Sequence, residues 1–358
     1  MKLGSLLKSS LLKKLLLIPV GIVIALVFAE VVIQLIGDPR DADHEKFLKS
    51  TLPHYRLAHL GLLAEDPDPR IRFTLRPGFD ARIGDDHYRV NQLGLRGGPV
   101  PLEKPAGTRR ILIVGDSYAF GFGVDEPDTL AARLQDDLRK DHGDVTVLNM
   151  GVPGYQTGQE LGRLERDGFR LQPDLVILVY YANDNVAASF HYDPERKICY
   201  VDELPLPLGF KRFMIRFALY AMATKAYTAH LERSGVLEAR NPDHMGVTRS
   251  RLAKIADLCR KQNVKLLLVA IPALASSTDL VNEDHIDTRL HRQILAHAQS
   301  EGIPAVDFRA ELIRVGKPIE ELILTDGERV DMHLTGEGYT MLARQIAARI
   351  REVALLDG

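Results

Sequence analysis

Five short apolar runs, each typical of a strand buried on both faces of a parallel sheet, occur between residues 111 and 308. They cover residues 111–114, 145–149, 174–181, 265–271 and 305–308. Apolar residues recur at helical spacing between and after these runs, at 129–140, 161–168, 287–298 and 336–353. This alternation predicts an α/β fold, a three-layer α/β/α domain whose central, mainly parallel sheet is covered by helices on both faces. Ligands bind such sheets at the carboxyl ends of the strands.

A longer apolar run, residues 15–37, lies near the N-terminus and has about the length needed to cross a bilayer as a helix. Glu30 and Gln34 stand toward its far end, where their side chains can reach the headgroups. Basic residues precede the run, namely Lys2, Lys8, Lys13 and Lys14. By the positive-inside rule the pattern predicts a single-pass anchor in the inner (cytoplasmic) membrane, with the chain after about residue 37 extracytoplasmic. In a Gram-negative cell that compartment is the periplasm.

A cleaved signal peptide is the alternative interpretation, since it begins with a similar basic stretch. Its apolar core would be shorter and would end at a small-x-small cleavage site, for which the nearest match is the poor Val27-Phe28-Ala29. The length of the run favours an uncleaved transmembrane helix. Its basic flank and terminal location argue against a buried core helix.

Four polar blocks follow the predicted strands or precede the last helix. They are 115–117 (Gly-Asp-Ser), 149–154 (Asn-Met-Gly-Val-Pro-Gly), 181–184 (Tyr-Ala-Asn-Asp) and 331–333 (Asp-Met-His). A serine on the turn after a buried strand can be held rigidly and still meet a substrate, although it can also serve only to cap the next helix. The other three blocks favour the first interpretation.

Together the blocks contain the groups that acyl chemistry on a serine requires. Ser117 needs an imidazole to take its proton, and His333 is the candidate because, of the 12 histidines, it alone combines an adjacent aspartate with a place after the last strand. Attack on an ester carbonyl puts negative charge on oxygen, so fixed donors must already point at that position. The backbone N–H groups of Ser117 and Gly154 and the side-chain amide of Asn183 could supply three donors.

In this order the blocks resemble the SGNH hydrolases, also called GDSL esterases and lipases, over about residues 105–352. The resemblance implies a flavodoxin-like α/β fold, Ser117 as nucleophile, Gly154 and Asn183 as oxyanion donors beside the Ser117 N–H, and His333 as base. The family's usual orienting aspartate precedes the histidine by three residues, where this chain has Val330. Members related to polysaccharide O-acetylation use an offset of two, which Asp331 satisfies.

The sequence does not identify the carboxylate that orients His333. An offset of two points the side chains of Asp331 and His333 the same way only if the segment is extended. Asp326 and Glu328 are the alternatives. Asp116 is expected to support the turn by hydrogen bonding to nearby backbone rather than to join the chemistry.

Other kinds of site find little support. The Gly-x-Ser-x-Gly elbow of α/β-hydrolases and the phosphate-binding loop are missing from the sequence, and residues 120–123 lack the third glycine of a dinucleotide site. Cys199 and Cys259 have no metal-ligand spacing, although an extracytoplasmic location permits a disulfide. A net charge of −2 without a basic stripe gives no reason to expect nucleic acid as a partner. We therefore predict no metal and no cofactor.

The predicted organisation is a cytoplasmic tail and transmembrane anchor (1–37), a membrane-proximal lead-in with short strands (38–104) and a hydrolase domain (105–354). In the lead-in, segments 71–78 and 88–97 are expected to be short strands separated by turns. Arg96 lies in the second segment, and its side chain is interpreted as part of this structural lead-in; the alternative is a contact with an anionic substrate. An insertion at about 187–245 contains a predicted helix at 210–223 with cations and large apolar side chains. This helix would lie on the membrane surface, form a lid or pack on the domain.

The sequence thus predicts a serine esterase that cleaves an acyl or acetyl ester through an acyl-enzyme, on an extracytoplasmic glycan or a lipid-linked substrate. An O-acyltransferase to polysaccharide would need the same residues. A non-catalytic glycan-binding or assembly factor is a third interpretation, because fold does not fix function. The expected partners are a small-molecule or glycan ester and, through the N-terminal helix, the membrane; the oligomeric state is left open.

Overall fold

The computed structural model describes residues 10–37, 56–185, 190–236, 245–272, 274, 276–325 and 330–356. The chain forms two compact units. The smaller comprises Met1–Lys49 and Val201–Ser234, and the larger comprises Ser50–Tyr200 and Gly235–Gly358.

The larger unit is built on a five-stranded parallel sheet with the strand order β11-β10-β7-β5-β6. Its strands are β5 (Arg109–Gly115), β6 (Val145–Asn149), β7 (Leu175–Tyr180), β10 (Lys265–Ala270) and β11 (Ala305–Asp307). Every residue of the central strand β7 is buried, as expected for a strand covered on both faces. All five predicted strands are confirmed.

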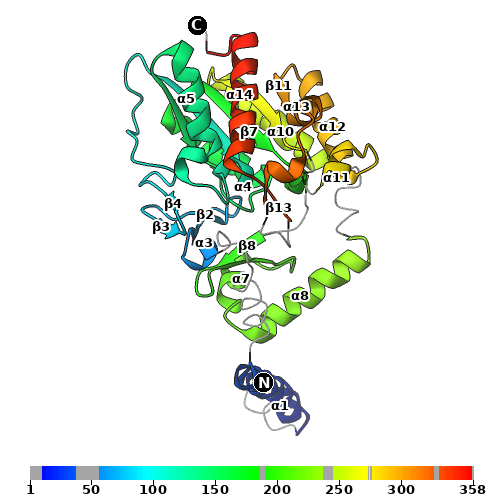
Figure 1. The fold of residues 1–358 in the computed structure, drawn as a ribbon. Coiled ribbons are helices and arrows are strands. Elements are labelled where there is room, and N and C mark those ends of the chain that lie inside the picture. The colour runs from blue at the N-terminus through cyan, green and yellow to red at the C-terminus, as the bar shows by residue number, and fades with distance from the viewer. Residues whose placement is uncertain are drawn as a thin grey trace. The chain divides into compact units, whose positions relative to one another are not determined.

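Helices cover both faces of this sheet, so the predicted three-layer α/β/α architecture is also confirmed (Figure 1). Ile111 and Ile113 of β5 pack in one apolar core, and the alternate residues Leu112 and Val114 pack in the other. The first core includes residues of α5 (Leu130–His142), α13 (Phe308–Val315) and α14 (Gly336–Glu352). The second includes residues of α6 (Thr157–Arg166), α10 (Gly246–Lys261) and α12 (Ile286–Ser300).

The lead-in forms a short helix and two small antiparallel sheets. They are α3 (Arg56–His59), β1 (Leu63–Glu65) with β2 (Phe73–Leu75), and β3 (Asp80–Ile83) with β4 (Asp86–Arg89). The prediction of a strand over 88–97 was wrong beyond Arg89. There the side chain of Asn91 accepts hydrogen bonds from the N–H groups of Leu93 and Leu95, at 3.0 and 3.2 Å, and these bonds hold a turn.

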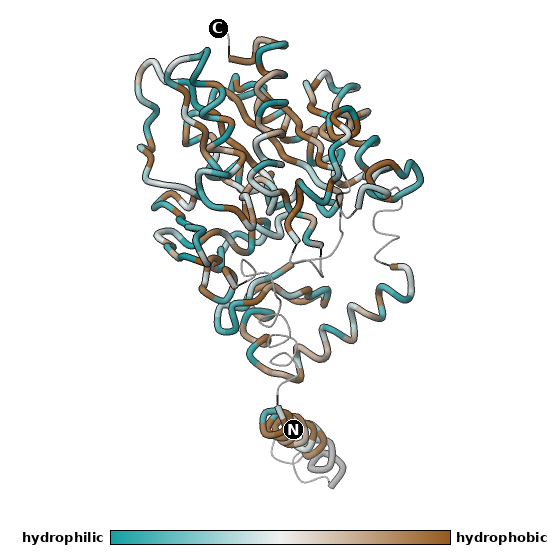
Figure 2. The backbone as a smooth tube through the Cα atoms, viewed as in Figure 1, coloured by the Kyte–Doolittle hydropathy of each residue, from teal (hydrophilic) through white to brown (hydrophobic). Residues whose placement is uncertain are grey.

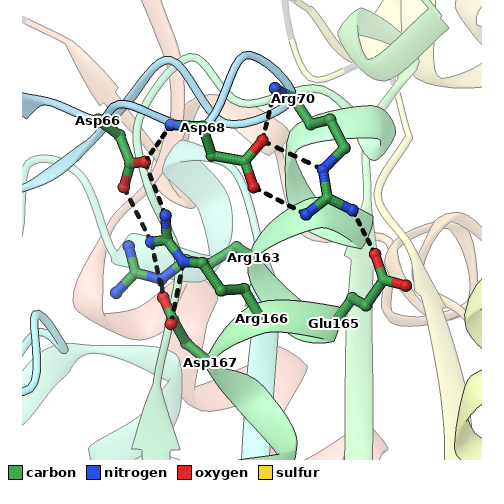
Figure 3. Close-up of polar contacts among 7 residues, drawn as sticks. All are labelled: Asp66, Asp68, Arg70, Arg163, Glu165, Arg166 and Asp167. Atoms are coloured by element: carbon green, nitrogen blue, oxygen red, sulfur yellow. Dashed lines mark hydrogen bonds and ion pairs between the residues drawn. The ribbon is translucent and has the colours of Figure 1, made fainter.

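Ion pairs fasten this lead-in to α6 (Figure 3). The carboxylate of Asp66 accepts two hydrogen bonds from Arg166, at 2.6 and 2.8 Å, while Arg70 bridges Asp68 and Glu165. Burial alone would raise the pKa of Asp66, but the bonds from Arg166 and from the Asp68 N–H hold that pKa below its ordinary value. The Asp66–Arg166 and Asp68–Arg70 pairs both have bidentate guanidinium–carboxylate geometry, which makes these contacts directional as well as strong.

The smaller unit contains the apolar N-terminal helix α1 (Ser10–Ile36), which is coloured hydrophobic in Figure 2. Its residues Leu17–Ile36 are long and apolar enough to cross a membrane, and none of them is buried. The unit also contains α7 (Leu208–Met214) and α8 (Ala218–Arg233). The prediction of one helix over 210–223 was therefore wrong, because the chain leaves the helical conformation at Phe217.

Both cysteines are free thiols, Cys199 on β9 (Ile198–Val201) and Cys259 on α10. The permitted disulfide is not formed. β9 pairs with β8 (Phe190–Asp193), and together they form a separate two-stranded sheet.

Candidate active site

Ser117 lies at the point where strand β5 of the parallel sheet ends and a short helix begins. β5 ends at Gly115, and Ser117 is the first residue of α4 (Ser117–Phe120). The cap of α4 is Asp116, whose Oδ1 accepts from the Tyr118 N–H at 2.9 Å. The helix is therefore capped by Asp116 and not by the hydroxyl of Ser117.

The hydroxyl of Ser117 is within hydrogen-bond distance of the His333 ring. The distance from Ser117 Oγ to His333 Nε2 is 2.7 Å. On the other ring nitrogen, His333 Nδ1 contacts Asp331 Oδ1, which also accepts from the His333 N–H at 3.0 Å. The structure thus brings three of the predicted site residues into one hydrogen-bonded chain. Asp326 and Glu328 lie outside the described residues.

The segment that carries Asp331 and His333 is extended. It forms β13 (Val330–Leu334), which pairs antiparallel with β12 (Ile323–Thr325). An extended chain is the condition under which an offset of two places both side chains on one side. The expectation that His333 lies on a loop was wrong, because β12 pairs with this segment. Thr335 does cap α14, as predicted, by accepting from the Gly338 N–H.

Two aromatic side chains contact the imidazole of His333. The ring centroids of Tyr118 and Phe122 lie 5.2 and 5.0 Å from that of His333. The Tyr118 hydroxyl donates to the Met332 carbonyl at 2.7 Å, which fixes β13 to the helix that begins with Ser117. Tyr118 was missed in the sequence; its position next to Ser117 was the only signal available.

The loop after β6 approaches α4 very closely. A Cβ on Gly151 would lie 2.3 Å from the Phe120 nitrogen, so only glycine fits there. The Val152 N–H donates to the Gly115 carbonyl at 3.1 Å. Farther along the loop, Gly154 has a φ of 81°, in the left-handed region, and is exposed. Among the described residues, the N–H groups of Ser117 and Gly154 have no acceptor.

Asn183 follows β7 on a short helical turn, Ala182–Asn185. Its Nδ2 donates to Asp116 Oδ2 at 2.9 Å, which leaves the second N–H of the amide for another acceptor. Asp116 is fully buried, and this burial raises its pKa above the ordinary value, although the bonds from Asn183 and from the Tyr118 N–H act in the opposite direction. Asp116 thus connects the turn of Ser117 to the side chain of Asn183.

Ser117, Gly154 and Asn183 come from the ends of β5, β6 and β7, with β5 between the other two strands. A model described as the GDSL-like lipase/acylhydrolase family matches residues 113–341, which contain all of these positions. The chain belongs to this family.

Three individual proteins are similar to parts of this chain. An arylesterase of Vibrio mimicus is 33% identical over 79 residues, which are 22% of this chain and 40% of that protein. The chain thus spans less than half the length of this curated relative. A lipase/acylhydrolase from Enterococcus faecalis shares 18% identity over 68% of this chain and 96% of its own, with a TM-score of 0.42. An acetylxylan esterase from Geobacillus stearothermophilus shares 16% over 68% and 94%, with a TM-score of 0.41.

In this GDSL-family chain the side chain of Arg96 is part of the structural core of the lead-in, as the favoured interpretation predicted. The alternative, a contact with an anionic substrate, is wrong. The guanidinium is buried and donates to the carbonyl groups of Phe120, Gly121 and Val124, at 2.8 Å for Phe120 and 2.6 Å for Val124. It also lies 4.7 Å from the ring centre of Tyr88. Arg96 therefore holds the loop that follows α4.

We expect Arg96→Ala to lower the free energy of unfolding by about 2 kcal/mol or more, since the buried carbonyl groups of Gly121 and Val124 would each lose a partner at roughly 1–3 kcal/mol. The Phe120 carbonyl would keep its hydrogen bond from the Asn149 amide. Arg96→Lys should recover only part of the loss, because an ammonium group lacks the planar fork. Denaturant unfolding measures both. The control is Arg89→Ala, which removes a partly exposed ion pair with Glu126 and should cost at most about 1 kcal/mol. Equal effects of Arg96→Ala and Arg89→Ala would contradict this role.

Two buried carboxyl groups, Glu160 and Asp184, lie near Asp116, and neither was predicted to belong to the site. Burial raises the pKa of Glu160 and of Asp184 well above their ordinary values. The charge of Asp116 raises both pKa values further, Glu160 also raises that of Asp184, and Arg251 acts in the opposite direction on both. Neither carboxylate oxygen of Glu160 has a hydrogen-bond partner among the described residues. The folded chain therefore binds these protons more tightly than the unfolded chain does.

A raised carboxyl pKa makes stability fall as the pH rises above the ordinary value, 4.5 for Glu160. We expect the free energy of unfolding of Glu160→Gln to depend less on pH than that of the unsubstituted chain. The stability of the variant relative to the unsubstituted chain should therefore increase toward neutral pH. Urea unfolding across a pH series measures this. Glu165→Gln, an exposed change on the same helix, should leave the pH dependence as it is. Parallel curves for the unsubstituted chain and Glu160→Gln would contradict the assignment.

Proposed function

We propose that the chain is a membrane-anchored serine hydrolase that cleaves an acyl or acetyl ester through an acyl-enzyme on Ser117. The observation that carries the proposal is the 2.7 Å contact between Ser117 Oγ and His333 Nε2, with Asp331 on the opposite ring nitrogen. A neutral serine becomes a competent nucleophile when a base in hydrogen-bond reach is itself oriented by a third group. Membership of an acylhydrolase family supports the same chemistry.

In this mechanism Ser117 Oγ attacks the ester carbonyl as His333 Nε2 takes its proton. The carbonyl oxygen becomes an oxyanion that receives hydrogen bonds from the N–H groups of Ser117 and Gly154 and from the amide of Asn183. Collapse breaks the ester bond, and the departing alkoxide takes the proton from His333. Water then attacks the acyl-enzyme with His333 as base, which releases the acid and restores Ser117. Asp331 holds the imidazole in the tautomer that presents Nε2 to the serine.

We further propose that the substrate is an extracytoplasmic glycan or a lipid-linked ester. The support is α1, whose residues Leu17–Ile36 suit a bilayer span, and the lysines before it, which favour an N-terminus in the cytoplasm. The larger unit then lies outside the inner membrane, in the periplasm of a Gram-negative cell. Esters carried by surface polysaccharides and their lipid-linked precursors are within reach of an enzyme held there.

Acyl transfer to a polysaccharide is the second candidate function. In this reaction a sugar hydroxyl, instead of water, attacks the acyl-enzyme. The two-residue offset of Asp331 and His333 favours it, because family members related to polysaccharide O-acetylation use the same offset. A non-catalytic glycan-binding role has less support, because Asp331 contacts His333 although it does not stand at the family's usual offset of three residues.

An acyl-acceptor assay tests these candidates. The full chain in detergent would be given a chromogenic acetate ester, with and without an acetyl-free polysaccharide, and the products identified by mass spectrometry. Free acetate alone supports hydrolysis, and acetate on the glycan supports transfer. Neither product from a folded protein would contradict both enzymatic candidates.

Asn183→Ala is expected to lower kcat by about a hundred- to a thousandfold, the usual cost of removing one oxyanion donor. KM should change little, because the amide acts mainly on charge that develops in the transition state. Asn185→Ala is a matched control on the same turn, since the Asn185 amide donates instead to the Tyr180 hydroxyl and the Ala182 carbonyl. A loss of kcat as large in Asn185→Ala would show that the turn, not the Asn183 amide, matters.

A further inference from the structure

The helices α7 and α8 form an elbow, residues 208–233, that exposes three phenylalanine side chains. The exposed fractions are 47% for Phe210, 55% for Phe213 and 37% for Phe217. The rings of Phe213 and Phe217 lie edge to face, with centroids 5.7 Å apart. Arg212 and Arg216 stand between these phenylalanines in the sequence. Clustered exposed aromatic rings with interleaved cations are typical of a segment that lies at a membrane interface.

A carboxylate of the apolar helix α1 fixes the depth of this elbow. Glu30 lies six residues before the end of α1 at Ile36, which corresponds to about 9 Å along a helix. Its two carboxylate oxygens accept hydrogen bonds from the N–H groups of Ala218 and Leu219, both at 2.9 Å. Gln34 donates to the same carboxylate at 2.9 Å.

The contact of Glu30 with Ala218 and Leu219 fixes the start of α8 to the apolar helix α1. An ionisable group inside a membrane span needs a polar partner, and the free N–H groups at the start of a helix satisfy a carboxylate well. Because Glu30 is part of α1, the first turn of α8 must lie at the depth of Glu30. Phe217 immediately precedes that turn, so it lies close to the same depth.

The elbow is also held together by a buried carboxylate. Lys211 of α7 donates to the Asp202 carbonyl at 2.8 Å, and the Tyr220 hydroxyl of α8 donates to Asp202 Oδ2 at 2.8 Å. Asp202 has no exposed surface. Both helices are thus fixed to one residue, and the phenylalanines are presented by a preformed element rather than by a loose loop.

We propose that the elbow is embedded in the membrane interface at the C-terminal end of α1, with Phe210, Phe213 and Phe217 among the acyl chains of phospholipids and Arg212 and Arg216 at headgroup level. The proposal rests on the membrane anchorage given above as part of the proposed function. It adds a second attachment, because the segment Val201–Ser234, which contains the elbow, continues into the larger unit at both ends. The catalytic residues are then tied to the bilayer surface by more than the single helix α1.

The chain contains no tryptophan, so one substitution introduces a unique fluorescent probe. Full-length Phe213→Trp would be reconstituted into phospholipid nanodiscs whose lipids carry bromine either near the headgroup end or near the tail end of the acyl chain. We expect its emission to be quenched, and more strongly by bromine near the headgroup. Phe210→Trp repeats the measurement from a second position in case Phe213→Trp disturbs the fold.

Two further variants distinguish a failure of the elbow proposal from a failure of the proposed membrane anchor. Ile313→Trp places the probe on α13 of the larger unit, at a side chain of similar exposure, and should not be quenched. Leu26→Trp places it in the middle of the apolar span and should be quenched if α1 crosses the bilayer. Quenching of Leu26→Trp without quenching at positions 210 and 213 would overturn the elbow proposal and leave the anchor in place. No quenching at any position would overturn both.

Discussion

Ser117→Ala is expected to lower kcat for ester hydrolysis by about a millionfold, the loss seen when the serine of a comparable catalytic unit is removed. The reason is the pairing of Ser117 Oγ with His333 Nε2, because without the hydroxyl no acyl-enzyme can form. Steady-state hydrolysis of a chromogenic acetate ester measures the effect. Ser276→Ala, which removes a serine that caps a different helix, should retain activity.

A double variant makes this prediction sharper. Ser117 and His333 should act as one unit, so Ser117→Ala combined with His333→Ala should be no slower than Ser117→Ala alone. A residual rate well above background in Ser117→Ala would contradict the mechanism. So would losses of the two single variants that multiply in the double variant.

Asp331→Asn is expected to lower kcat by about ten-thousandfold while the fold is retained. An amide at this position presents an N–H to His333 Nδ1 and favours the tautomer in which Nε2 carries the proton, so that Nε2 cannot accept the proton of Ser117. Asp331 is buried against His333, and the carboxylate is therefore well placed to stabilise the imidazolium that forms. The same chromogenic assay measures the loss.

The alternative carboxylates provide the controls for this second prediction. Asp326→Asn and Glu328→Gln are expected to leave kcat unchanged, because the contact of Asp331 Oδ1 with His333 Nδ1 already supplies the orienting group. Retained activity in Asp331→Asn together with a large loss in one of the other two would move the orienting role to that residue.

The central sheet could be predicted from sequence because strands buried on both faces leave continuous apolar runs, as in β5 and β7. The helix α10 was not predicted, although Leu252, Ile255, Ala256 and Cys259 follow helical spacing among many charged residues. The strands β12 and β13 left no usable pattern, because they are three and five residues long and are defined by pairing with each other. Short paired strands depend on tertiary contacts rather than on local sequence.

The candidate site divides in the same way. Ser117, Asn183 and His333 stood out because each lies in a short polar block next to a predicted element. Arg96 was noted, but its contacts were not predicted, and Glu160 was not noted at all, since what they do depends on groups far away in the sequence, such as the Phe120 carbonyl for Arg96. Glu30 was expected to reach headgroups, whereas its carboxylate caps a helix 188 residues away. A sequence pattern carries no signal for a contact of that kind.

Labelling of the full chain with a fluorophosphonate tests the central claim most directly. The reagent phosphonylates a serine only where that serine is activated, and mass spectrometry of the digested protein identifies the modified residue. The account predicts labelling at Ser117 that is lost in His333→Ala. A folded chain that is not labelled at Ser117, or a label on Ser117 that persists unchanged in His333→Ala, would contradict it.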